Sequence, residues 1–543
     1  MQTVFQYLAA QPVLVLFGLI GIGMYLGHFR IKGIGLGAAA VLFLAIGISA
    51  WGTAEGVDMV SKFPHEFGKL GLALFAFAIG INSGNSFFAS LKKSLGIMAA
   101  TFAVLAGGGV VACVLGKIAG MDAATIGGTF AGAITNTPAL AAAGAASGDE
   151  QSATVAYSIA YLFGVFGMLI VATLALNYGK NDKDRPASLV SRTVRVERDD
   201  RPSVRDIRAH VGENVRFSRL RETEDGPIVR PTADTKLGKG CLVTVVGPQN
   251  LVVEVVSELG HGSSISLAAD RRDWDYRRIT ISDPKLAGRT LGELGLEERY
   301  QATVSRVRRG DTDMLGRADL VLQMGDRVRV VAPTKNLKEL SKYFGDSTTG
   351  LTSINPVALG VGMVLGLLIG EFPILTPSGE YFTIGSAAGT LLVGLIFGRV
   401  GRIGPFPTAL PYTASQVLAE FGLLVFLAQA GYNAGGQIMK AFTSGAWLGI
   451  LLVGMAVTLT VGFGLYFVMR YGFKMGGTRL SGLLAGAQTQ PAVLAYANNR
   501  TNFDPRVALG YSLVYPLAMV GKDPNRTNHR WLISLPIFKF LQR

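Results

Sequence analysis

Two short polar stretches interrupt apolar sequence and could bind a small ligand. The first is Gly132-Ala133-Ile134-Thr135-Asn136-Thr137-Pro138, and Gly486-Ala487-Gln488-Thr489-Gln490-Pro491 repeats it 354 positions later. Proline removes a backbone donor and clashes with the preceding turn, so each stretch is expected to break a helix. Within a membrane such a break is tolerated only where protein buries it or where it lines an aqueous cavity. Paired breaks at matching positions of two halves indicate the binding site of a transporter.

The side chains at these breaks are neutral hydrogen-bonding groups. An amino-acid substrate needs acceptors for its ammonium group and donors for its carboxylates, and amides and hydroxyls supply both. Half-helix N-termini add free N–H groups and a partial positive charge. The alternative is a pair of proline kinks that threonine hydroxyls stabilise without any ligand. We expect a substrate-binding site without a fixed charge, formed by Thr135, Asn136, Thr137, Pro138, Gln488, Thr489, Gln490 and Pro491.

A second pair of candidates lies between glycines in two apolar segments. Asn82 occurs in Gly80-Ile81-Asn82-Ser83-Gly84, and Asn433 in Gly431-Tyr432-Asn433-Ala434-Gly435. An asparagine in hydrocarbon requires a hydrogen-bond partner. Each asparagine therefore either lines the substrate pathway or holds two helices together, and the sequence leaves both possibilities open.

The other ionisable groups near apolar segments lie at segment ends, which favours anchoring at the membrane interface over a gate or a proton-coupling role. No histidine has metal-ligand spacing with Cys113 or Cys241, so no metal site is expected. The central part has neither G-x-G-x-x-G after a strand nor a P-loop, and no Ser/His/Asp set can be assembled. We expect no cofactor and no enzymatic activity. The interface residues are Lys69, Lys117, Glu420, Asp122, Glu371, His28 and His65.

The charge distribution divides the chain into a highly charged central part and a remainder with few charges. The chain has 543 residues, of which 49% are hydrophobic and 16% are charged, whereas soluble proteins average about 25% charged residues. Residues 180–349 hold 57 of the 88 charged side chains. The rest of the chain has few charged residues, which predicts membrane-spanning segments. The net charge of +14 then reflects topology and lipid contact, and no nucleic-acid partner is expected.

The sequence of the membrane part predicts two repeats of opposite orientation. The glycine-asparagine segments are 351 positions apart, and Tyr157-Ser158-Ile159-Ala160-Tyr161 matches Tyr511-Ser512-Leu513-Val514-Tyr515 at 354. In the first repeat, Lys92-Lys93 separates two apolar runs at 70–88 and 95–115, and cations follow alternate runs. The expected fold is a polytopic α-helical membrane protein with two inverted-topology repeats of about five spans, each with a broken or re-entrant helix.

The central part predicts two small α+β domains. Short β-forming runs occur at 194–196, 242–246, 279–281 and 328–331, flanked by turn residues. The segment 234–240 precedes one run and 319–325 precedes another, which suggests a smaller repeat at a spacing of 85. We expect domains at 195–262 and 270–345, between membrane repeats at 12–180 and 354–520. An atypical basic tail follows at 521–543.

Together the duplicated membrane motif and the central β runs resemble the aspartate:alanine exchanger (AAEx) family of bacterial secondary transporters. The two central units resemble the C-terminal domains of regulators of potassium conductance (RCK-C). The resemblance implies a transporter of the bacterial inner membrane with its central domains in the cytoplasm, and a homodimer. It implies exchange of small carboxylates, with L-aspartate entering against L-alanine. Succinate-type dicarboxylate exporters belong to the same family, so they are an alternative.

Two functions of other classes compete with exchange. A channel gated by the central domains is one, but the chain has no Thr-Val-Gly-Tyr-Gly filter. A membrane sensor that binds a ligand without transporting it is the other. Inward movement of one anion for one zwitterion moves charge, which makes aspartate:alanine exchange electrogenic. The expected partners are the carboxylate or amino-acid substrate and the lipid bilayer.

Overall fold

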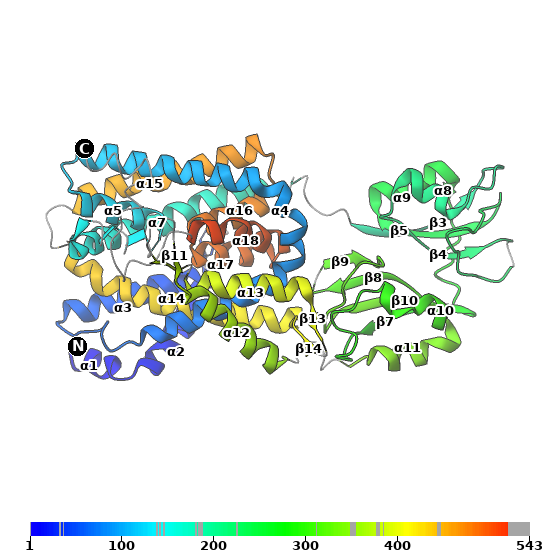
Figure 1. Cartoon of the computed structure of the whole chain (residues 1–543), viewed down its shortest axis with the longest axis horizontal. Helices are drawn as coiled ribbons and strands as arrows, with labels where there is room; N and C mark the ends of the chain where they lie inside the picture. Colours follow the sequence, from blue (N-terminus) through cyan, green and yellow to red (C-terminus); the bar gives the residue numbers. More distant parts are fainter. Residues whose placement is uncertain are drawn as a thin grey trace. The chain divides into compact units, whose positions relative to one another are not determined.

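The computed structural model describes most of the chain and divides it into two compact units (Figure 1). The helical unit comprises Met1–Asp184, Gly360–Arg399 and Gln416–Arg543, and the α+β unit comprises Arg185–Leu359 and Val400–Ser415. The chain therefore passes between the units four times. The described residues are 2–31, 34–35, 37–136, 139–140, 143–144, 147–179, 182, 188–223, 226–310, 312–347, 354–375, 381–383, 385–404, 406–442 and 447–519.

The first repeat consists of apolar helices and one two-stranded hairpin. Polar residues begin several helices: Asp122 accepts the N–H of Thr125, and Asp149 accepts that of Ser152. The elements are α1 (Gln2–Ala9), α2 (Pro12–Gly27), β1 (Arg30–Ile31), β2 (Ile34–Gly35), α3 (Ala39–Ala54), α4 (His65–Ile118), α5 (Ala123–Ala133) and α7 (Glu150–Asn177).

The second repeat follows the same plan after the α+β domains. Proline stands at the first position of three of its helices, where its missing N–H costs nothing. The elements are α12 (Pro356–Glu371), β11 (Ile374–Leu375), β12 (Tyr381–Phe382), α13 (Ser386–Val400), β13 (Arg402–Ile403), β14 (Phe406–Pro407), α14 (Tyr412–Phe442), α15 (Trp447–Phe467), a π-helical turn (Val468–Gly472), α16 (Gly477–Ala487), α17 (Pro491–Thr501) and α18 (Pro505–Met519).

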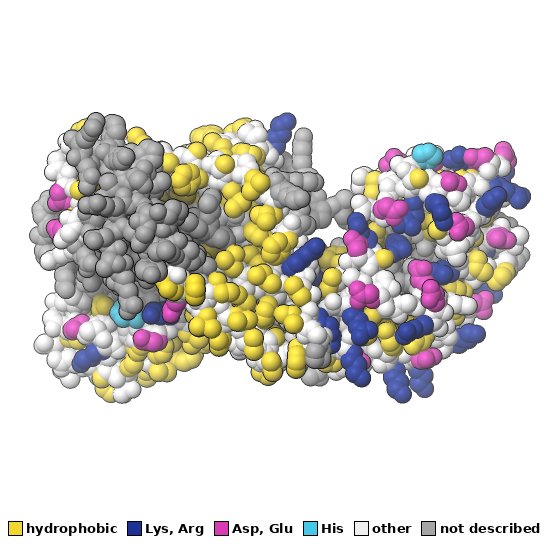
Figure 2. Space-filling model, in the orientation of Figure 1, with side chains coloured by type: hydrophobic (Ala, Val, Ile, Leu, Met, Phe, Trp, Pro, Cys, Tyr) yellow, Lys and Arg dark blue, Asp and Glu magenta, His cyan; other side chains and the backbone are white. Residues whose placement is uncertain are grey.

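Length and composition make these helices membrane-spanning. Within the described residues, five segments are long and apolar enough to cross a bilayer, two of them in α4, or six if α1 and α2, which meet at 105°, form one span. Large apolar side chains on α2, α12 and α15 are exposed, as lipid-facing side chains are. Figure 2 shows hydrophobic side chains gathered over the helical unit and charged side chains over the α+β unit. The expected fold class is confirmed. The five spans are His65–Asn85, Ser94–Ile118, Gln151–Asn177, Tyr412–Gly436 and Trp447–Gly472.

The two apolar runs on either side of Lys92-Lys93 both appear as spans, at His65–Asn85 and Ser94–Ile118, but a helical segment rather than a loop connects them, because α4 is helical from His65 to Ile118. The connecting residues 86–93 contain neither proline nor glycine, so nothing in this stretch removes a backbone donor or favours a turn. The pair Lys92-Lys93, which suggested the loop, lies inside this helix.

Glycines bring the helices of the two repeats into close contact in a reciprocal pattern. A Cβ at Gly71 of α4 would lie 2.5 Å from the carbonyl oxygen of Gly422 of α14, and a Cβ at Gly422 would lie 2.5 Å from that of Gly71. Gly80 of α4 abuts the backbone of α13, and Gly431 of α14 abuts the backbone of α3. Each repeat thus packs onto the other as two copies related by a twofold axis do.

The α+β unit contains two four-stranded antiparallel sheets that share the arrangement of three strands and differ in the edge to which the fourth strand is added. The central strand of each, β5 or β10, follows a glycine with positive φ, Gly240 (84°) or Gly325 (82°). The first sheet has the order β4-β5-β3-β6 and the second β7-β10-β8-β9. The strands are β3 (Leu189–Val196), β4 (Arg216–Arg221), β5 (Leu242–Pro248), β6 (Gly260–Gly262), β7 (Trp274–Thr280), β8 (Thr303–Arg309), β9 (Thr312–Leu315) and β10 (Arg327–Pro333).

Helices cover these sheets, and a hairpin from the second membrane repeat joins the unit. The side chain of Arg402, in the β13–β14 hairpin, donates from Nη1 to the carbonyl oxygens of Pro284 (2.9 Å) and Ala287 (2.8 Å). All four β runs expected from the sequence lie in or directly beside strands. The helices are α8 (Val204–Val211), α9 (Gln249–Leu259), α10 (Leu296–Tyr300), α11 (Leu337–Phe344) and the 3₁₀ turns Gly292–Leu294 and Thr334–Asn336.

Candidate functional site

The two polar stretches end α5 and α16 in the same geometry. Thr135 has φ 50° and Thr489 has φ 53°. The N–H of Asn136 donates to the carbonyl of Ala131 (2.7 Å), and the N–H of Gln490 donates to that of Ala485 (2.9 Å). These left-handed residues and six-residue hydrogen bonds are Schellman motifs, which satisfy the last carbonyls of a helix. Both helices therefore stop at equivalent positions and leave the chain free to turn.

The left-handed residue of a Schellman motif is usually glycine, whereas both copies here use threonine. A β-branched residue with positive φ is sterically disfavoured, at a cost of about 1 to 3 kcal/mol. The same unfavourable choice at Thr135 and Thr489 means that the hydroxyl contributes something that glycine lacks. That contribution is visible in the hydrogen bonds between the repeats.

Hydroxyl and amide groups join the two breaks directly. Thr135 Oγ1 donates to the carbonyl of Gln488 (2.7 Å), and Thr489 Oγ1 donates to the carbonyl of Thr135 (3.4 Å). Gln488 Nε2 and Thr458 Oγ1 of α15 both donate to the carbonyl of Ala133, at 3.0 and 2.9 Å. The helix-end carbonyls of one repeat are thus satisfied partly by side chains of the other.

The next residue of each break caps the following helix and reaches across to the other repeat. Asn136 Oδ1 accepts the N–H of Ala139 (2.9 Å), while its Nδ2 donates to the carbonyl of Ala518 in α18 (3.3 Å). Gln490 Oε1 accepts the N–H of Ala492 (3.2 Å), while its Nε2 donates to Tyr161 Oη in α7 (3.2 Å). Each amide therefore links a half-helix N-terminus of its own repeat to a helix of the other.

Close helix packing positions both breaks. A Cβ at Gly132 would lie 2.3 Å from the carbonyl oxygen of Tyr157 in α7, and a Cβ at Gly486 would lie 2.6 Å from that of Tyr511 in α18. The rings of Tyr511 and Tyr515 stack at 4.7 Å. Gly132 and Gly486 therefore allow α5 and α16 to approach their partner helices closely.

The two breaks meet at a place that we call the crossing. One buried acceptor at the crossing lacks a donor among the described residues. Gln488 is fully buried, and its Oε1 has no hydrogen-bond partner in the described part of the chain. Its orientation is determined, because Nε2 faces a carbonyl that can only accept. A buried acceptor without a donor costs about 1 to 3 kcal/mol. Gln488 Oε1 can therefore accept a hydrogen bond from a group outside the described residues.

The structure brings together most, but not all, of the expected site residues. Thr135, Asn136, Gln488, Thr489 and Gln490 meet at the crossing, and Pro491 begins α17 directly behind it. The other two residues of the first stretch, Thr137 and Pro138, lie outside the described residues.

Asn433 lies in a separate polar cluster at the start of α4. The side-chain nitrogens of Asn433 and Gln429 each lie 3.2 Å from His65 Nδ1, so this ring nitrogen accepts. Asn433 Oδ1 is buried and has no partner among the described residues. The half-buried Asn82 of α4 has the equivalent place in the first repeat. The described contacts of Asn433 thus join α14 to α4 and do not involve the breaks.

The first half-helix of each break is capped differently. Asp122 caps α5 through the N–H of Thr125 (2.7 Å), but the equivalent residue of the second repeat is Gly476. Instead, Asp182 Oδ1 accepts the N–H of Gly477 (2.6 Å) and its Oδ2 accepts that of Thr478 (2.9 Å). The end of the first repeat thus supplies the cap that the second repeat lacks.

Sequence reasoning missed Thr458, Tyr161, Gln429 and Asp182. Tyr161 had a signal, because its five-residue motif recurs at Tyr515, but it was used only as evidence for the repeat. Thr458 lies in an apolar helix, and Asp182 contacts residues 295 positions away. No group of three or more His, Cys, Asp or Glu residues within the described ranges could hold a metal ion.

Two membrane repeats whose broken helices meet and exchange hydrogen bonds define a class of protein, the membrane transporters built from internal repeats. Comparison with protein families agrees. The family model Asp-Al_Ex, described as a predicted permease membrane region, matches residues 15–177 and 358–522. The TrkA-C domain model, an RCK-C-like domain, matches residues 276–345. The chain belongs to the Asp-Al_Ex permease family.

Similar proteins from several bacteria are named as transporters. An uncharacterized transporter of Geobacter sulfurreducens is 37% identical over 543 residues, covering 95% of this chain and 97% of the relative. An uncharacterized transporter of Cutibacterium acnes is 34% identical, with 95% and 97% covered. One from Corynebacterium diphtheriae is 36% identical, with 94% and 97% covered. No solved structure matches the chain. Transport is the function that these relatives share by name.

Proposed function

We propose that this transporter exchanges small carboxylates at the crossing of its two breaks, with L-aspartate entering as L-alanine leaves. The observation that carries the proposal is the pair of left-handed threonines, Thr135 and Thr489, hydrogen-bonded between repeats at equivalent positions. The family name Asp-Al_Ex, which we interpret as aspartate paired with alanine, supports this choice of substrates. The protein lies in the bacterial inner membrane as a homodimer, with its α+β domains in the cytoplasm.

The site offers what an amino acid requires. Half-helix N-termini lie next to Asn136 and Gln490, and they favour carboxylates. Gln488 Oε1, the acceptor without a described donor, suits an ammonium group. This last observation favours amino acids over succinate, which has no N–H group.

Exchange follows if the loaded site reorients more readily than the empty one. The residues at the crossing are buried, so the substrate leaves only when one body of the protein moves. We assign α3, the first half of α4, α13 and α14 to one body, because their glycines are in mutual contact, and α5, α7, α16 and α18 to the other, which moves in an elevator-like stroke. The second half of α4 contacts α5 through Gly108 and Gly116. Aspartate against alanine moves one charge per cycle, equivalent to about 2.3 kcal/mol at 100 mV.

The test is uptake of labelled aspartate into proteoliposomes preloaded with alanine, succinate or buffer alone. We expect rapid uptake only against alanine, and faster uptake when the membrane potential favours inward movement of negative charge. Uptake only against succinate would make the protein a dicarboxylate exchanger with the same site. Ligand binding without flux would instead support the sensor, and single-channel currents would support the channel.

A further inference from the structure

One face of the second α+β sheet carries arginines on three neighbouring strands. Arg278 of β7 pairs in register with Arg329 of β10, which in turn pairs with Arg306 of β8. Two residues away on the same strands, Arg327 of β10 pairs with Arg308 of β8. These five side chains share a face because residues two apart on a strand point the same way. The alternating residues, such as Ile279, Val307 and Val328, form the core on the opposite face.

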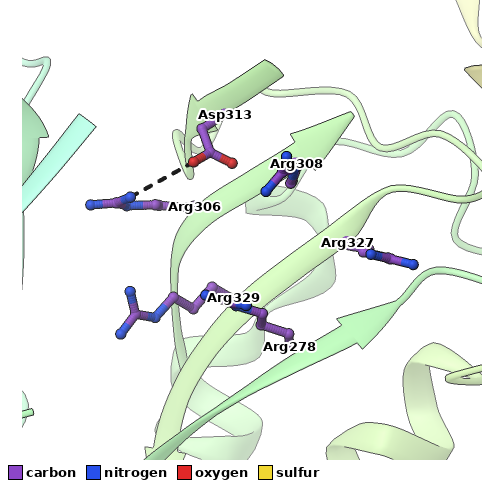
Figure 3. Close-up of a pocket in the computed structure, with 6 residues that line it drawn as sticks. All are labelled: Arg278, Arg306, Arg308, Asp313, Arg327 and Arg329. Carbon is purple, nitrogen blue, oxygen red and sulfur yellow. Dashed lines mark ion pairs between the residues drawn. The ribbon is translucent and has the colours of Figure 1, made fainter. Parts of the chain in front are cut away.

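These arginines line a cavity with a single carboxylate. The cavity has a volume of ≈ 90 Å³ and is lined by the five arginines and Asp313 (Figure 3). Asp313 pairs with Arg306 at 3.8 Å, which is long for an ion pair. Like charges directly opposite each other on neighbouring strands destabilise a sheet. Arg278, Arg327 and Arg329 have no ion pair with a carboxylate among the described residues, so several like charges lie close together on this face.

Partial burial increases the cost of this charge. Burial lowers the pKa of Arg306 and of Arg329 below the ordinary arginine value. Arg329 stacks over the ring of Tyr276 at 3.9 Å, a contact that holds the guanidinium but does not neutralise it. The guanidinium groups are thus partly removed from water without acquiring a matching number of negative charges.

A buried arginine of the first sheet adds to the same field. Arg219 of β4 is 2% exposed, and its Nε and Nη2 have no hydrogen-bond partner among the described residues. Burial, and then the charge of Arg329, lower the pKa of Arg219 to about 10. The carboxylate of Asp275 raises this pKa, but it compensates only part of the lowering. Arg219 does not line the cavity, but its charge acts on Arg329 and adds to the positive potential beside the arginines of the second sheet.

We propose that this arginine face, comprising Arg278, Arg306, Arg308, Arg327 and Arg329, binds the phosphate group of a small molecule. Guanidinium forks match phosphate oxygens bidentately, and a phosphate group presents its charge and several oxygens at one point. A dicarboxylate would distribute its two charges over two separate groups. The cavity has room for one such group and is well below the about 300 to 1,000 Å³ of a pocket for a whole drug-sized ligand. The rest of a larger ligand would extend beyond it.

A phosphate held there would join three strands of the domain. The neutralised arginines would then stabilise the sheet in place of repelling one another. The site lies in the α+β unit, and it is therefore independent of the exchange proposed for the membrane repeats.

The test measures the unfolding temperature of the full-length protein, purified in detergent, as a function of ligand concentration. The probes are sodium phosphate, adenosine monophosphate and sodium succinate, with sodium chloride at matched ionic strength. We expect a saturable rise in Tm with phosphate or adenosine monophosphate and none with the other two. Tighter binding of adenosine monophosphate would identify a nucleotide as the source of the phosphate, and equal binding would identify the free anion.

Two double variants keep the result specific. Arg278→Gln with Arg327→Gln removes two exposed arginines of the face, and should weaken phosphate binding about tenfold or more. Without ligand, this variant should melt no lower than the wild type, because it loses only repulsion. Arg192→Gln with Arg277→Gln removes two exposed arginines elsewhere and should leave binding unchanged. The same loss in both variants, an equal response to sodium chloride, or a response to succinate alone would overturn the proposal.

Discussion

The hydroxyl of Thr489 donates to the backbone carbonyl of Thr135 at 3.4 Å, although the residues are 354 positions apart. Both have positive φ, and both occupy the same position of the same helix-ending motif. The two repeats are thus joined at the point where each interrupts a helix. A change at one break is therefore transmitted to the other through hydrogen bonds, and the predictions below depend on this connection.

Replacing Thr135 by valine should slow exchange by about tenfold or more. Valine retains the shape but leaves the carbonyl of Gln488 without its donor, which costs about 1 to 3 kcal/mol. Thr135→Ser retains the hydroxyl and should retain most of the activity. The matched control is Thr460→Val, whose exposed hydroxyl bonds only within its own helix. Initial rates of aspartate uptake into alanine-loaded proteoliposomes measure the effect, and equal rates in the two valine variants would contradict it.

Asn136→Ala and Gln490→Ala should each reduce exchange while the protein still inserts into the membrane. Each amide both caps a half-helix and contacts a helix of the other repeat, so alanine removes two hydrogen bonds. Helix caps alone are worth about 0.5 to 2 kcal/mol. Membrane extraction and gel filtration report insertion, and counterflow reports transport. Normal flux in both variants would leave the breaks as structural kinks without a substrate.

Gln488→Met should alter substrate preference. Methionine has a similar volume but removes Oε1, the acceptor that we assign to the substrate's ammonium group, together with the donor to Ala133. Loss of the donor weakens transport of every substrate. Loss of the acceptor adds a penalty of about 1 to 3 kcal/mol for amino acids alone. The ratio of alanine-driven to succinate-driven aspartate uptake should therefore fall, and an unchanged ratio would separate Oε1 from recognition.

Gly71→Ala and Gly422→Ala should each destabilise the helical unit. The added Cβ would lie 2.5 Å from a backbone oxygen of the facing helix, so α4 and α14 would have to separate. Gly107→Ala is the control, because it lies on the same helix as Gly71 and a Cβ there meets nothing within 4 Å. Thermal unfolding in detergent should show a loss for the first two variants and none for the third. A loss of the same size at Gly107 would mean that helix-packing glycines are not the cause.

Asp182→Ala should lower the unfolding temperature by roughly 4 to 8 °C. It removes both acceptors for the first turn of α16 and the carboxylate that faces Arg470 and Arg506. Asp182→Asn retains an acceptor and should have an intermediate effect. Asp122→Ala removes an exposed cap with one acceptor contact and should cost about half as much or less. The opposite order for Asp122 and Asp182 would mean that the cap of the second repeat comes from elsewhere.

The repeat, the breaks and the α+β domains were readable from the sequence because each depends on local pattern. Proline beside Thr-Asn or Thr-Gln, glycines at a constant offset and β-forming runs all act over a few residues. The two spans beside Lys92-Lys93 were predicted, but their helical connection was not, because paired cations favour a loop between two spans. The contacts of His65 with Gln429 and of Asp182 with Gly477 were beyond reach, since only the packed helices bring them together.

The hairpin that carries Arg402 changes what the α+β domains are to the protein. Its guanidinium binds carbonyl oxygens at Pro284 and Ala287, and the hairpin is itself the connection between α13 and α14. The domains are therefore more than an insertion between the two membrane repeats, because they also bind a hairpin that belongs to the second repeat. A truncation that cut the chain only at the two ends of the insertion would leave this hairpin without its binding surface. A variant of the protein that lacked these domains would also need a different connection between α13 and α14, because Arg402 of that connection binds Ala287, 115 residues earlier in the chain.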